Sequence, residues 1–261
     1  MGETALITGA SSGIGHELAH VLARAGYDLI VVARSAGKLE ELKAALPERK
    51  VTVIIQDLAA PGAAQTVFRR VRELGLSVNV LINNAGFGLV GAFDTLEFAE
   101  QSDMIHVNVL ALTQLTYLFL PELKKNSGKI LNVASTAAFQ PGPFMAVYFA
   151  SKAYVLSLSR ALAEELRGSG VTVTTLCPGP THTQFGAVAH AEKTRMFAKT
   201  MDVRRVAATA FQAMLNGKVC VIPGTLNAAG AIGAKLLPAG VGAKVVRFVT
   251  NQTSKSNDMK K

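Results

Sequence analysis

The sequence predicts an α/β protein built on a seven-stranded, mostly parallel, doubly wound sheet with helices on both faces. Short apolar runs alternate with longer amphipathic segments over about 220 residues, which is typical of parallel strands joined by right-handed crossovers. The short runs are nearly continuous in Val, Ile and Leu, as expected for strands that are covered on both faces. No linker or internal repeat interrupts the pattern, so we expect a single domain.

The individual elements follow from apolar periodicity and from stop signals. The short runs predict strands at Ala5–Thr8, Asp28–Ala33, Val51–Ile55, Val78–Ile82, Lys129–Val133, Val171–Leu176 and Val219–Ile222. The amphipathic segments predict helices at Gly13–Ala25, Lys38–Leu46, Ala63–Leu74, Phe98–Leu120, Tyr148–Arg167 and Val203–Leu215. Several helices are expected to stop at a glycine or proline, namely Gly26, Pro47, Gly75, Pro121 and Gly217.

Composition excludes several classes of protein. Of 261 residues, 49% are apolar and 17% are charged, which excludes an intrinsically disordered chain. A net charge of +9 favours anionic partners or is simply a solvated surface. The basic residues are scattered, so we expect no nucleic-acid partner, and the five histidines lack metal-ligand spacing, so we expect no metal. Cys177 and Cys220 are too few for a disulfide scaffold, which favours a cytoplasmic protein.

A glycine-rich loop follows the first strand and precedes the first helix. It reads Thr8-Gly9-Ala10-Ser11-Ser12-Gly13-Ile14-Gly15. In this position glycines allow a sharp turn and a close backbone approach to a pyrophosphate, and the helix N-terminus offers unpaired N–H groups to the phosphates. The alternative is a tight turn without a ligand, but the position after the first strand favours a dinucleotide site.

The end of the second strand indicates which dinucleotide binds. An acidic residue there would accept a hydrogen bond from the adenosine ribose, but the sequence reads Val32-Ala33-Arg34-Ser35. The Arg34 guanidinium can bind a 2′-phosphate instead, so we expect NADP rather than NAD. Otherwise Arg34 is an ordinary surface residue near a strand end.

Tyr148 and Lys152 are four residues apart in a predicted helix and therefore share one face. A phenol with a pKa near 10 is a poor acid–base group at neutral pH, and a neighbouring ammonium lowers that pKa. Ser135 follows the strand Lys129–Val133, at the sheet edge where ligands gather. The spacing alone is common on helix surfaces, and it gains meaning only together with the glycine loop.

Together these motifs resemble the short-chain dehydrogenase/reductase family, in its single-domain form with a Rossmann-type fold and an Asn–Ser–Tyr–Lys tetrad. The resemblance covers residues 4 to about 223. It rests on the order and spacing of Thr8–Gly15, Asp57, Asn83-Asn84-Ala85-Gly86, Asn108, Ser135, Tyr148, Lys152 and Pro178-Gly179.

The resemblance implies four catalytic residues. Tyr148 exchanges a proton with the carbonyl or alcohol oxygen, and Lys152 binds the nicotinamide ribose and lowers the tyrosine pKa. Ser135 holds the carbonyl oxygen. Asn108 keeps a water that connects Lys152 to solvent.

The resemblance also implies the cofactor contacts. Besides Tyr148 and Lys152, these are Gly9, Ser11, Ser12, Gly13, Ile14, Gly15, Arg34, Ser35, Asp57, Asn83, Ala85, Gly86, Pro178, Gly179, Thr181 and Thr183. Asp57 is expected at the adenine amino group, although capping the turn after its strand is an alternative. Thr181 and Thr183 are expected to anchor the nicotinamide carboxamide.

The chain is therefore expected to contain a catalytic domain over residues 1–223, with a substrate lid at about 179–200, and an apolar extension with a polar tail over 224–261. Apolar residues around the expected pocket favour a hydrophobic or acyl-bearing ketone. For residues 225–250 we leave open a cover over the substrate cleft, a subunit contact, or contact with a membrane surface. The family implies a homodimer or homotetramer, formed through the helices Phe98–Leu120 and Tyr148–Arg167.

The sequence thus predicts an NADP-dependent reductase of carbonyl compounds, or the reverse alcohol dehydrogenase. The alternative is a sensor or scaffold protein that binds NADP without turnover. Such proteins typically lose the tyrosine or the lysine, and both are present here.

Overall fold

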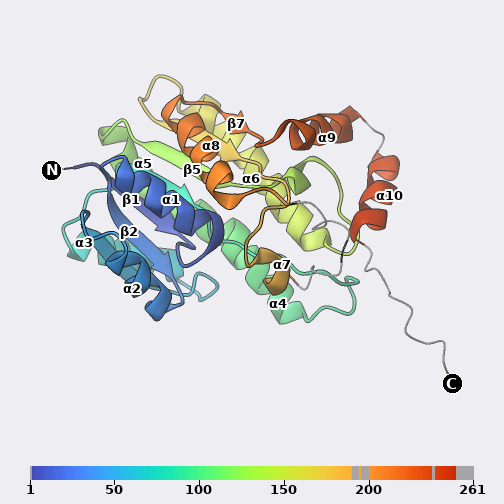
Figure 1. The fold of residues 1–261 in the computed structure, drawn as a ribbon, viewed down its shortest axis with the longest axis horizontal. Coiled ribbons are helices and arrows are strands. Elements are labelled where there is room, and N and C mark those ends of the chain that lie inside the picture. Colours follow the sequence, from blue (N-terminus) through green and yellow to red (C-terminus); the bar gives the residue numbers. More distant parts are fainter. Residues whose placement is uncertain (1, 190–193, 195–199, 237–238, 251–261) are drawn as a thin grey trace.

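The computed structural model describes residues 2–189, 194, 200–236 and 239–250 (Figure 1). Its centre is one seven-stranded sheet with the order β3-β2-β1-β4-β5-β6-β7, in which every neighbouring pair is parallel. The strands are β1 (Thr4–Thr8), β2 (Asp28–Ala33), β3 (Val51–Ile55), β4 (Val80–Asn83), β5 (Lys129–Val133), β6 (Thr172–Leu176) and β7 (Cys220–Val221). The predicted doubly wound α/β fold is confirmed.

Helices cover both faces of the sheet (Figure 1). The α-helices are α1 (Gly13–Arg24), α2 (Ala36–Ala44), α3 (Ala63–Glu73), α4 (Phe98–Ile105), α5 (Leu112–Lys125), α6 (Ala146–Glu165), α7 (Phe185–Val188), α8 (Val203–Leu215), α9 (Thr225–Leu236) and α10 (Ala239–Thr250). A π-helical segment, η1 (His106–Ala111), joins α4 to α5, and a 3-10 turn, η2 (Thr136–Phe139), follows β5.

The two-sided cover explains why the strands lack polar alternation. Successive side chains of a strand point to opposite faces, so Leu6 and Ile7 of β1 enter different cores. Leu6 packs with Val67 of α3 and Phe119 of α5. Ile7 packs with residues of α1, α2 and α8 on the other face, among them Val206. A polar residue at either strand position would therefore be buried.

The long helix after β4 differs from the prediction at its end. Pro121 does not stop it, because α5 continues to Lys125 with the proline inside. Proline removes the hydrogen bond to the carbonyl four residues earlier, which belongs to Tyr117. Tyr117 is 77% exposed, so water can replace the lost bond there. The π-helical turn His106–Ala111 is a second feature that apolar periodicity did not reveal.

Several apolar side chains on the outer helices remain exposed. Phe98 and Tyr117 are 79% and 77% exposed, and Tyr154 on α6 is 40% exposed. In the described part of the chain, one helical stretch (Phe98–Lys125) is long and apolar enough to cross a membrane by length and composition alone, and 44% of its apolar window is buried in the fold. The expected homodimer or homotetramer through these helices stays a prediction.

Candidate functional site

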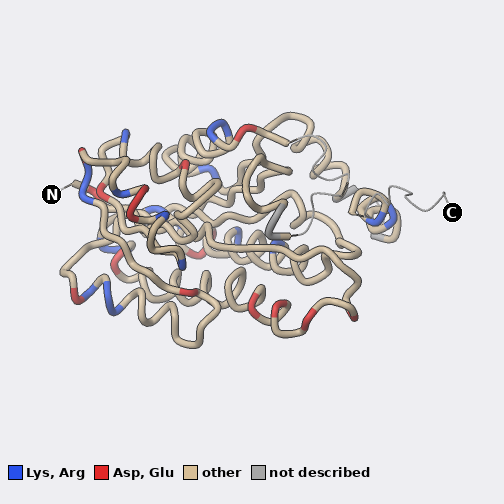
Figure 2. The backbone as a smooth tube through the Cα atoms, turned by 60° about the horizontal axis from the view of Figure 1, so that its bottom comes forward, with Lys and Arg blue, Asp and Glu red and all other residues tan. Residues whose placement is uncertain are grey.

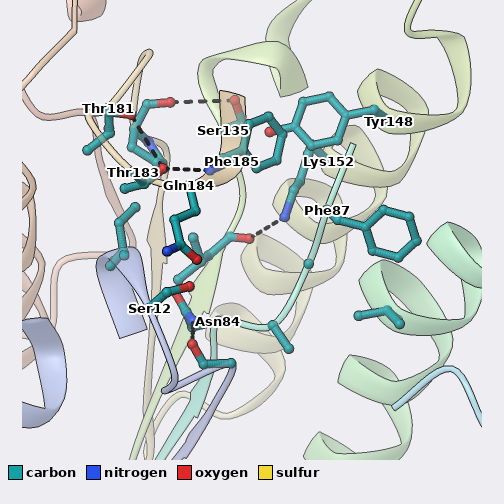
Figure 3. A pocket seen from close by; sticks show the side chains of 18 of the residues that line it. Ser12, Asn84, Phe87, Ser135, Tyr148, Lys152, Thr181, Thr183, Gln184 and Phe185 are labelled. Carbon is teal, nitrogen blue, oxygen red and sulfur yellow. Dashed lines mark hydrogen bonds between the residues drawn. The ribbon is translucent and has the colours of Figure 1, made fainter. Parts of the chain in front are cut away.

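A cleft of about 600 Å³ lies over the carboxyl ends of the parallel strands (Figure 3). Most of the predicted site residues line it, namely Gly9, Ser11, Ser12, Gly13, Ile14, Arg34, Ser35, Asp57, Ala85, Gly86, Ser135, Tyr148, Lys152, Pro178, Gly179, Thr181 and Thr183. Three predicted residues, Gly15, Asn83 and Asn108, lie outside this lining. The fold thus gathers loops that are far apart in sequence at one edge of the sheet.

The predicted glycine loop forms the turn between β1 and α1. Gly9 and Gly13 have φ values of +67° and +58°, a region that glycine adopts without strain. At Gly15 a Cβ atom would lie 2.5 Å from the carbonyl oxygen of Gly9, so Gly15 supports the loop from behind. Within the described chain, the Ser12 side chain does not cap α1, which leaves the first N–H groups available to phosphates. These features fit a dinucleotide pyrophosphate.

Asn84 holds the glycine loop against the loop after β4, a role that sequence reasoning missed. Its Nδ2 donates hydrogen bonds to the carbonyl oxygens of Thr8 (2.9 Å) and Gly9 (3.2 Å). The neighbouring Asn83 is 2% exposed, and its side chain donates instead to Asn132 within the sheet. The strand period separates the two, because adjacent side chains point in opposite directions. The pair Asn83-Asn84 was the available signal, but the sequence did not show which side chain faces the loop.

The end of the cleft beside the carboxyl end of β2 carries cations. Arg34 is 73% exposed along its side chain, and its Nη1 lies 3.8 Å from Oδ2 of Asp57. The other Asp57 oxygen accepts a hydrogen bond from the Ala59 backbone at 3.0 Å, so Asp57 also caps the turn after β3. Lys38, in the first turn of α2, lines the same cleft and was not predicted.

Tyr148 and Lys152 lie on one face of α6, and Ser135 approaches them from the end of β5 (Figure 3). Tyr148 and Lys152 are 8% and 5% exposed. Lys152 Nζ donates to the carbonyl oxygen of Val133 at 2.9 Å and lies 5.8 Å from the centroid of the Tyr148 ring. The three side chains that the sequence predicted to act together therefore meet at one end of the cleft.

Burial sets the protonation of this group. It raises the pKa of Tyr148 to about 12, although a hydrogen bond with Ser135 favours the phenolate and opposes this rise. Burial also lowers the pKa of Lys152 to about 8. The tyrosine pKa therefore moves in the direction opposite to the one expected from an adjacent ammonium. At neutral pH Tyr148 is a neutral phenol, which is the form that can donate a proton.

Asn108 lies behind the cleft, in the π-helical turn. Its side chain donates to the carbonyl oxygen of Phe87 (2.9 Å) and to Ser151 Oγ (3.0 Å), and accepts from the Phe87 N–H. A Cβ atom at Gly86 would lie 2.8 Å from Asn108 Oδ1 and 3.2 Å from Lys152 Nζ, so these two side chains converge on the same glycine. Asn108 thus fixes the loop after β4 next to the lysine.

The loop after β6 forms the wall opposite the glycine loop. Thr181 donates to the Gly179 carbonyl at 2.9 Å, and its backbone pairs with Met201. A Cβ atom at Gly13 would meet Thr183 at 3.2 Å, which brings the two walls together at the start of α1. The expected lid at about 179–200 includes residues 190–193 and 195–199, which lie outside the described residues.

The helix α10 contributes to the end of the cleft beside Tyr148. Val245, Val246 and Val249 line it, and Val246 is 4% exposed and packs in one apolar cluster with Tyr148 and Phe149. Of the three roles left open for residues 225–250, a cover over the cleft therefore agrees with the observed packing. Sequence reasoning did not identify these three valines, because only the tertiary fold brings α10 to Tyr148.

A family model described as short chain dehydrogenase matches residues 3–194. A very-long-chain 3-oxoacyl-CoA reductase of Kluyveromyces lactis is 39% identical over 183 residues, which is 66% of this chain and 53% of that protein. The 17-beta-hydroxysteroid dehydrogenase type 3 of Mus musculus is 32% identical over 185 residues, or 68% of this chain and 60% of that protein. The chain thus spans less than two thirds of the length of these curated relatives.

Solved structures share the fold over most of the chain. A short-chain dehydrogenase from Sphingobium yanoikuyae, in complex with NADPH, is 31% identical, with a TM-score of 0.80 over 99% of this chain and 100% of that chain. A bulky-bulky ketone specific alcohol dehydrogenase from Comamonas testosteroni is also 31% identical, with a TM-score of 0.76 over 90% of this chain and 92% of that chain. The match to the first of these structures includes the C-terminal helices.

Proposed function

Because the chain belongs to the short-chain dehydrogenase family, we propose that it is an oxidoreductase that transfers a hydride between NADP and the carbonyl or secondary alcohol of an apolar substrate. One observation carries the proposal: the buried Tyr148 lies beside Ser135 and Lys152 in the same cleft as the glycine loop. A protein that only binds nucleotide has no need for this acid–base group.

The residues of the chain divide the chemistry between them. When bound, the nicotinamide supplies or takes up the hydride. Ser135 donates a hydrogen bond to the carbonyl oxygen and stabilises the negative charge that develops there. Tyr148, neutral at pH 7, donates the proton to the same oxygen. Lys152 binds the nicotinamide ribose, and its positive charge favours the phenolate that remains after transfer.

NADP, rather than NAD, is proposed from the charge at the adenosine end. Arg34 and Lys38 both line the cleft there, and a 2′-phosphate supplies the acceptor oxygens that a guanidinium binds in bidentate fashion. Asp57 lies 3.8 Å from Arg34, so it orients the guanidinium at the cleft edge. A relative in structure was solved with NADPH, which agrees with this choice.

Replacing Arg34 by alanine is expected to weaken NADPH binding by about 10- to 100-fold, since a hydrogen bond to a charged group contributes about 1.5–3 kcal/mol. NADH binding should barely change, because NADH lacks the extra phosphate. Thermal shifts of the wild type and the variant with each cofactor measure both effects. Arg69→Ala, on the distant helix α3, controls for the loss of one positive charge. A larger wild-type shift with NADH than with NADPH would refute the NADP assignment.

For the substrate we propose a ketone with a hydrophobic or acyl substituent. Phe87, Phe149, Phe185 and the α10 valines give the cleft an apolar end beside Tyr148. The names of two relatives, a very-long-chain 3-oxoacyl-CoA reductase and a hydroxysteroid dehydrogenase, agree with a large apolar substrate. The direct test is to mix the wild-type protein with NADPH and a panel of 3-oxoacyl thioesters, bulky ketones and sugars, and to follow cofactor absorbance. If the protein reduces none of these compounds, the proposal is refuted.

The outer surface of the C-terminal helices favours a second proposal, that the protein contacts an anionic membrane surface through residues 225–250. Leu226 and Val241 are 75% and 45% exposed, and residues 203–257 contain no Asp or Glu. In Figure 2, Lys and Arg residues are drawn in blue at this end of the chain. Apolar side chains with flanking cations are typical of helices that bind at a lipid interface.

Co-sedimentation with vesicles tests this contact. The wild type is expected to bind vesicles that contain phosphatidylserine at low salt, and to bind neutral phosphatidylcholine vesicles less. The double variant Leu226→Ser, Lys244→Ser should lose about 10²- to 10³-fold in affinity, since one buried leucine contributes about 1.5–3 kcal/mol and each cation about 1 kcal/mol. Leu74→Ser, at an exposed leucine outside these helices, is the control. Absence of wild-type binding at low salt would rule the contact out.

A further inference from the structure

The loop of residues 142–145, between η2 and α6, contains a backbone conformation that needs support. Phe144 has a φ of +63°, one of two non-glycine residues with positive φ in the described chain. A bulky side chain rarely adopts this region, because its Cβ atom clashes with the backbone. Such a residue persists where its surroundings hold it, and that is most common near functional sites. The contacts around Phe144 are therefore informative.

Two backbone hydrogen bonds hold the loop locally. The Gly91 N–H donates to the Phe144 carbonyl at 2.9 Å, and the Met145 N–H donates to the Gly142 carbonyl at 3.1 Å. A Cβ atom at Gly142 would collide with the ring of Phe149, so the loop backbone lies directly on a side chain that lines the cleft. The shape of this loop therefore sets the position of the Phe149 ring.

The other two contacts come from α10, about a hundred residues later in the chain. The Arg247 guanidinium carbon lies 5.8 Å from the centroid of the Phe144 ring, a cation–π distance. The Thr250 hydroxyl lies 3.0 Å from the Pro143 carbonyl and 2.8 Å from the Val246 carbonyl, so its single proton is shared between the loop and its own helix. Thr250 is fully buried. These contacts join α10 to the loop.

Ser135 and Lys152 are held independently of this junction. Lys152 donates to Val133 on β5, and Ser135 caps the η2 turn by accepting from the Ala137 N–H. Loosening the contact between α10 and the loop would therefore change the shape of the substrate end of the cleft, at Phe149 and the α10 valines, and leave Ser135 and Lys152 in place. A long substituent should be sensitive to that change and a short one should not.

We propose that Arg247 and Thr250 are positioning residues that hold the 142–145 loop in its left-handed conformation and so determine how well the site accepts ketones with a long apolar substituent. The inference rests on the proposed reductase function. It assigns the C-terminal helix two roles at the substrate end, a direct one through its valines and an indirect one through Phe144.

Kinetics with substrates of two lengths test the proposal. In Thr250→Val and in Arg247→Ala, KM for a long-chain 3-oxoacyl thioester should rise about three- to tenfold, the range expected for one lost hydrogen bond or cation–π contact. Its kcat, and both constants for acetoacetyl thioester, should stay within about twofold. Thr250→Ser keeps the hydroxyl and should restore the wild-type KM. Thr209→Val is the matched control, since that hydroxyl bonds only within its own helix, to the Arg205 carbonyl.

Hydrogen exchange separates this proposal from the proposed function. The Gly91 and Met145 amides donate the bonds of the loop, so both should exchange faster in Thr250→Val and Arg247→Ala than in the wild type or Thr209→Val. If the wild type reduces no ketone, the proposed function fails, and the exchange rates still decide whether α10 holds the loop. Unchanged exchange, or an equal change of KM for long and short substrates, would overturn the inference. Because Arg247 is exposed, its variant remains informative even if Thr250→Val fails to fold.

Discussion

Tyr148→Phe is expected to lower kcat for ketone reduction by about 10²- to 10⁴-fold, the usual contribution of a positioned general acid. The substitution removes one oxygen and keeps the ring, which packs against Phe149 and Phe185. The fold and NADPH binding should therefore be retained. The measurement compares NADPH consumption by the two proteins, with thermal shifts to confirm that the variant binds cofactor.

The matched control is Tyr154→Phe, on the same helix. Tyr154 is 40% exposed, and its hydroxyl lies 3.0 Å from Thr113 Oγ1, away from the cleft. We expect wild-type turnover from it. Equal, slow NADPH consumption by the wild type and Tyr148→Phe would show that Tyr148 donates no proton. The alternative of an NADP-binding sensor or scaffold without turnover would then be favoured.

Lys152→Met is expected to reveal the energetic cost of burying an ammonium. Burial lowers the pKa of Lys152 to about 8 in the native protein, from an ordinary value of 10.5. Between pH 8 and pH 10.5, Lys152 is protonated in the unfolded chain and neutral in the native chain. The free energy of unfolding of the wild type therefore rises with pH in this range. Methionine does not titrate. The unfolding free energy of the wild type should therefore rise relative to the variant by about 3 kcal/mol between pH 7 and pH 11.

Urea unfolding, followed by circular dichroism at several pH values, measures this difference. The variant also leaves the Val133 carbonyl without its donor, but that loss does not depend on pH. Tyr148 titrates in both proteins, so its contribution to the unfolding free energy cancels when the two are compared. Lys124→Met, at an exposed position, controls for the general loss of a lysine. A difference that stays constant across the range would contradict a buried, charged Lys152. Turnover by this variant should also fall, because Lys152 belongs to the acid–base group.

The structure bears out the sequence prediction most closely where local patterns carry the information. Nearly continuous apolar runs predicted the strands because the inner strands are buried on both faces, as Leu6 and Ile7 of β1 are. Pro121 was interpreted wrongly, because a proline is tolerated inside a helix where water can reach the freed carbonyl, and exposure is not visible in the sequence. The π-helical turn around Asn108 also escaped prediction, since one extra residue barely alters apolar periodicity.

By itself the sequence determined the β–α order, the glycine loop, and the residue types and spacing of Ser135, Tyr148 and Lys152. These are local properties, because they depend on near neighbours in the chain. Only the tertiary structure decided that Asn84 rather than Asn83 supports the loop, that burial raises the pKa of Tyr148, and that α10 reaches Phe144. Burial, desolvation and contacts across the chain depend on which distant segments the fold brings together.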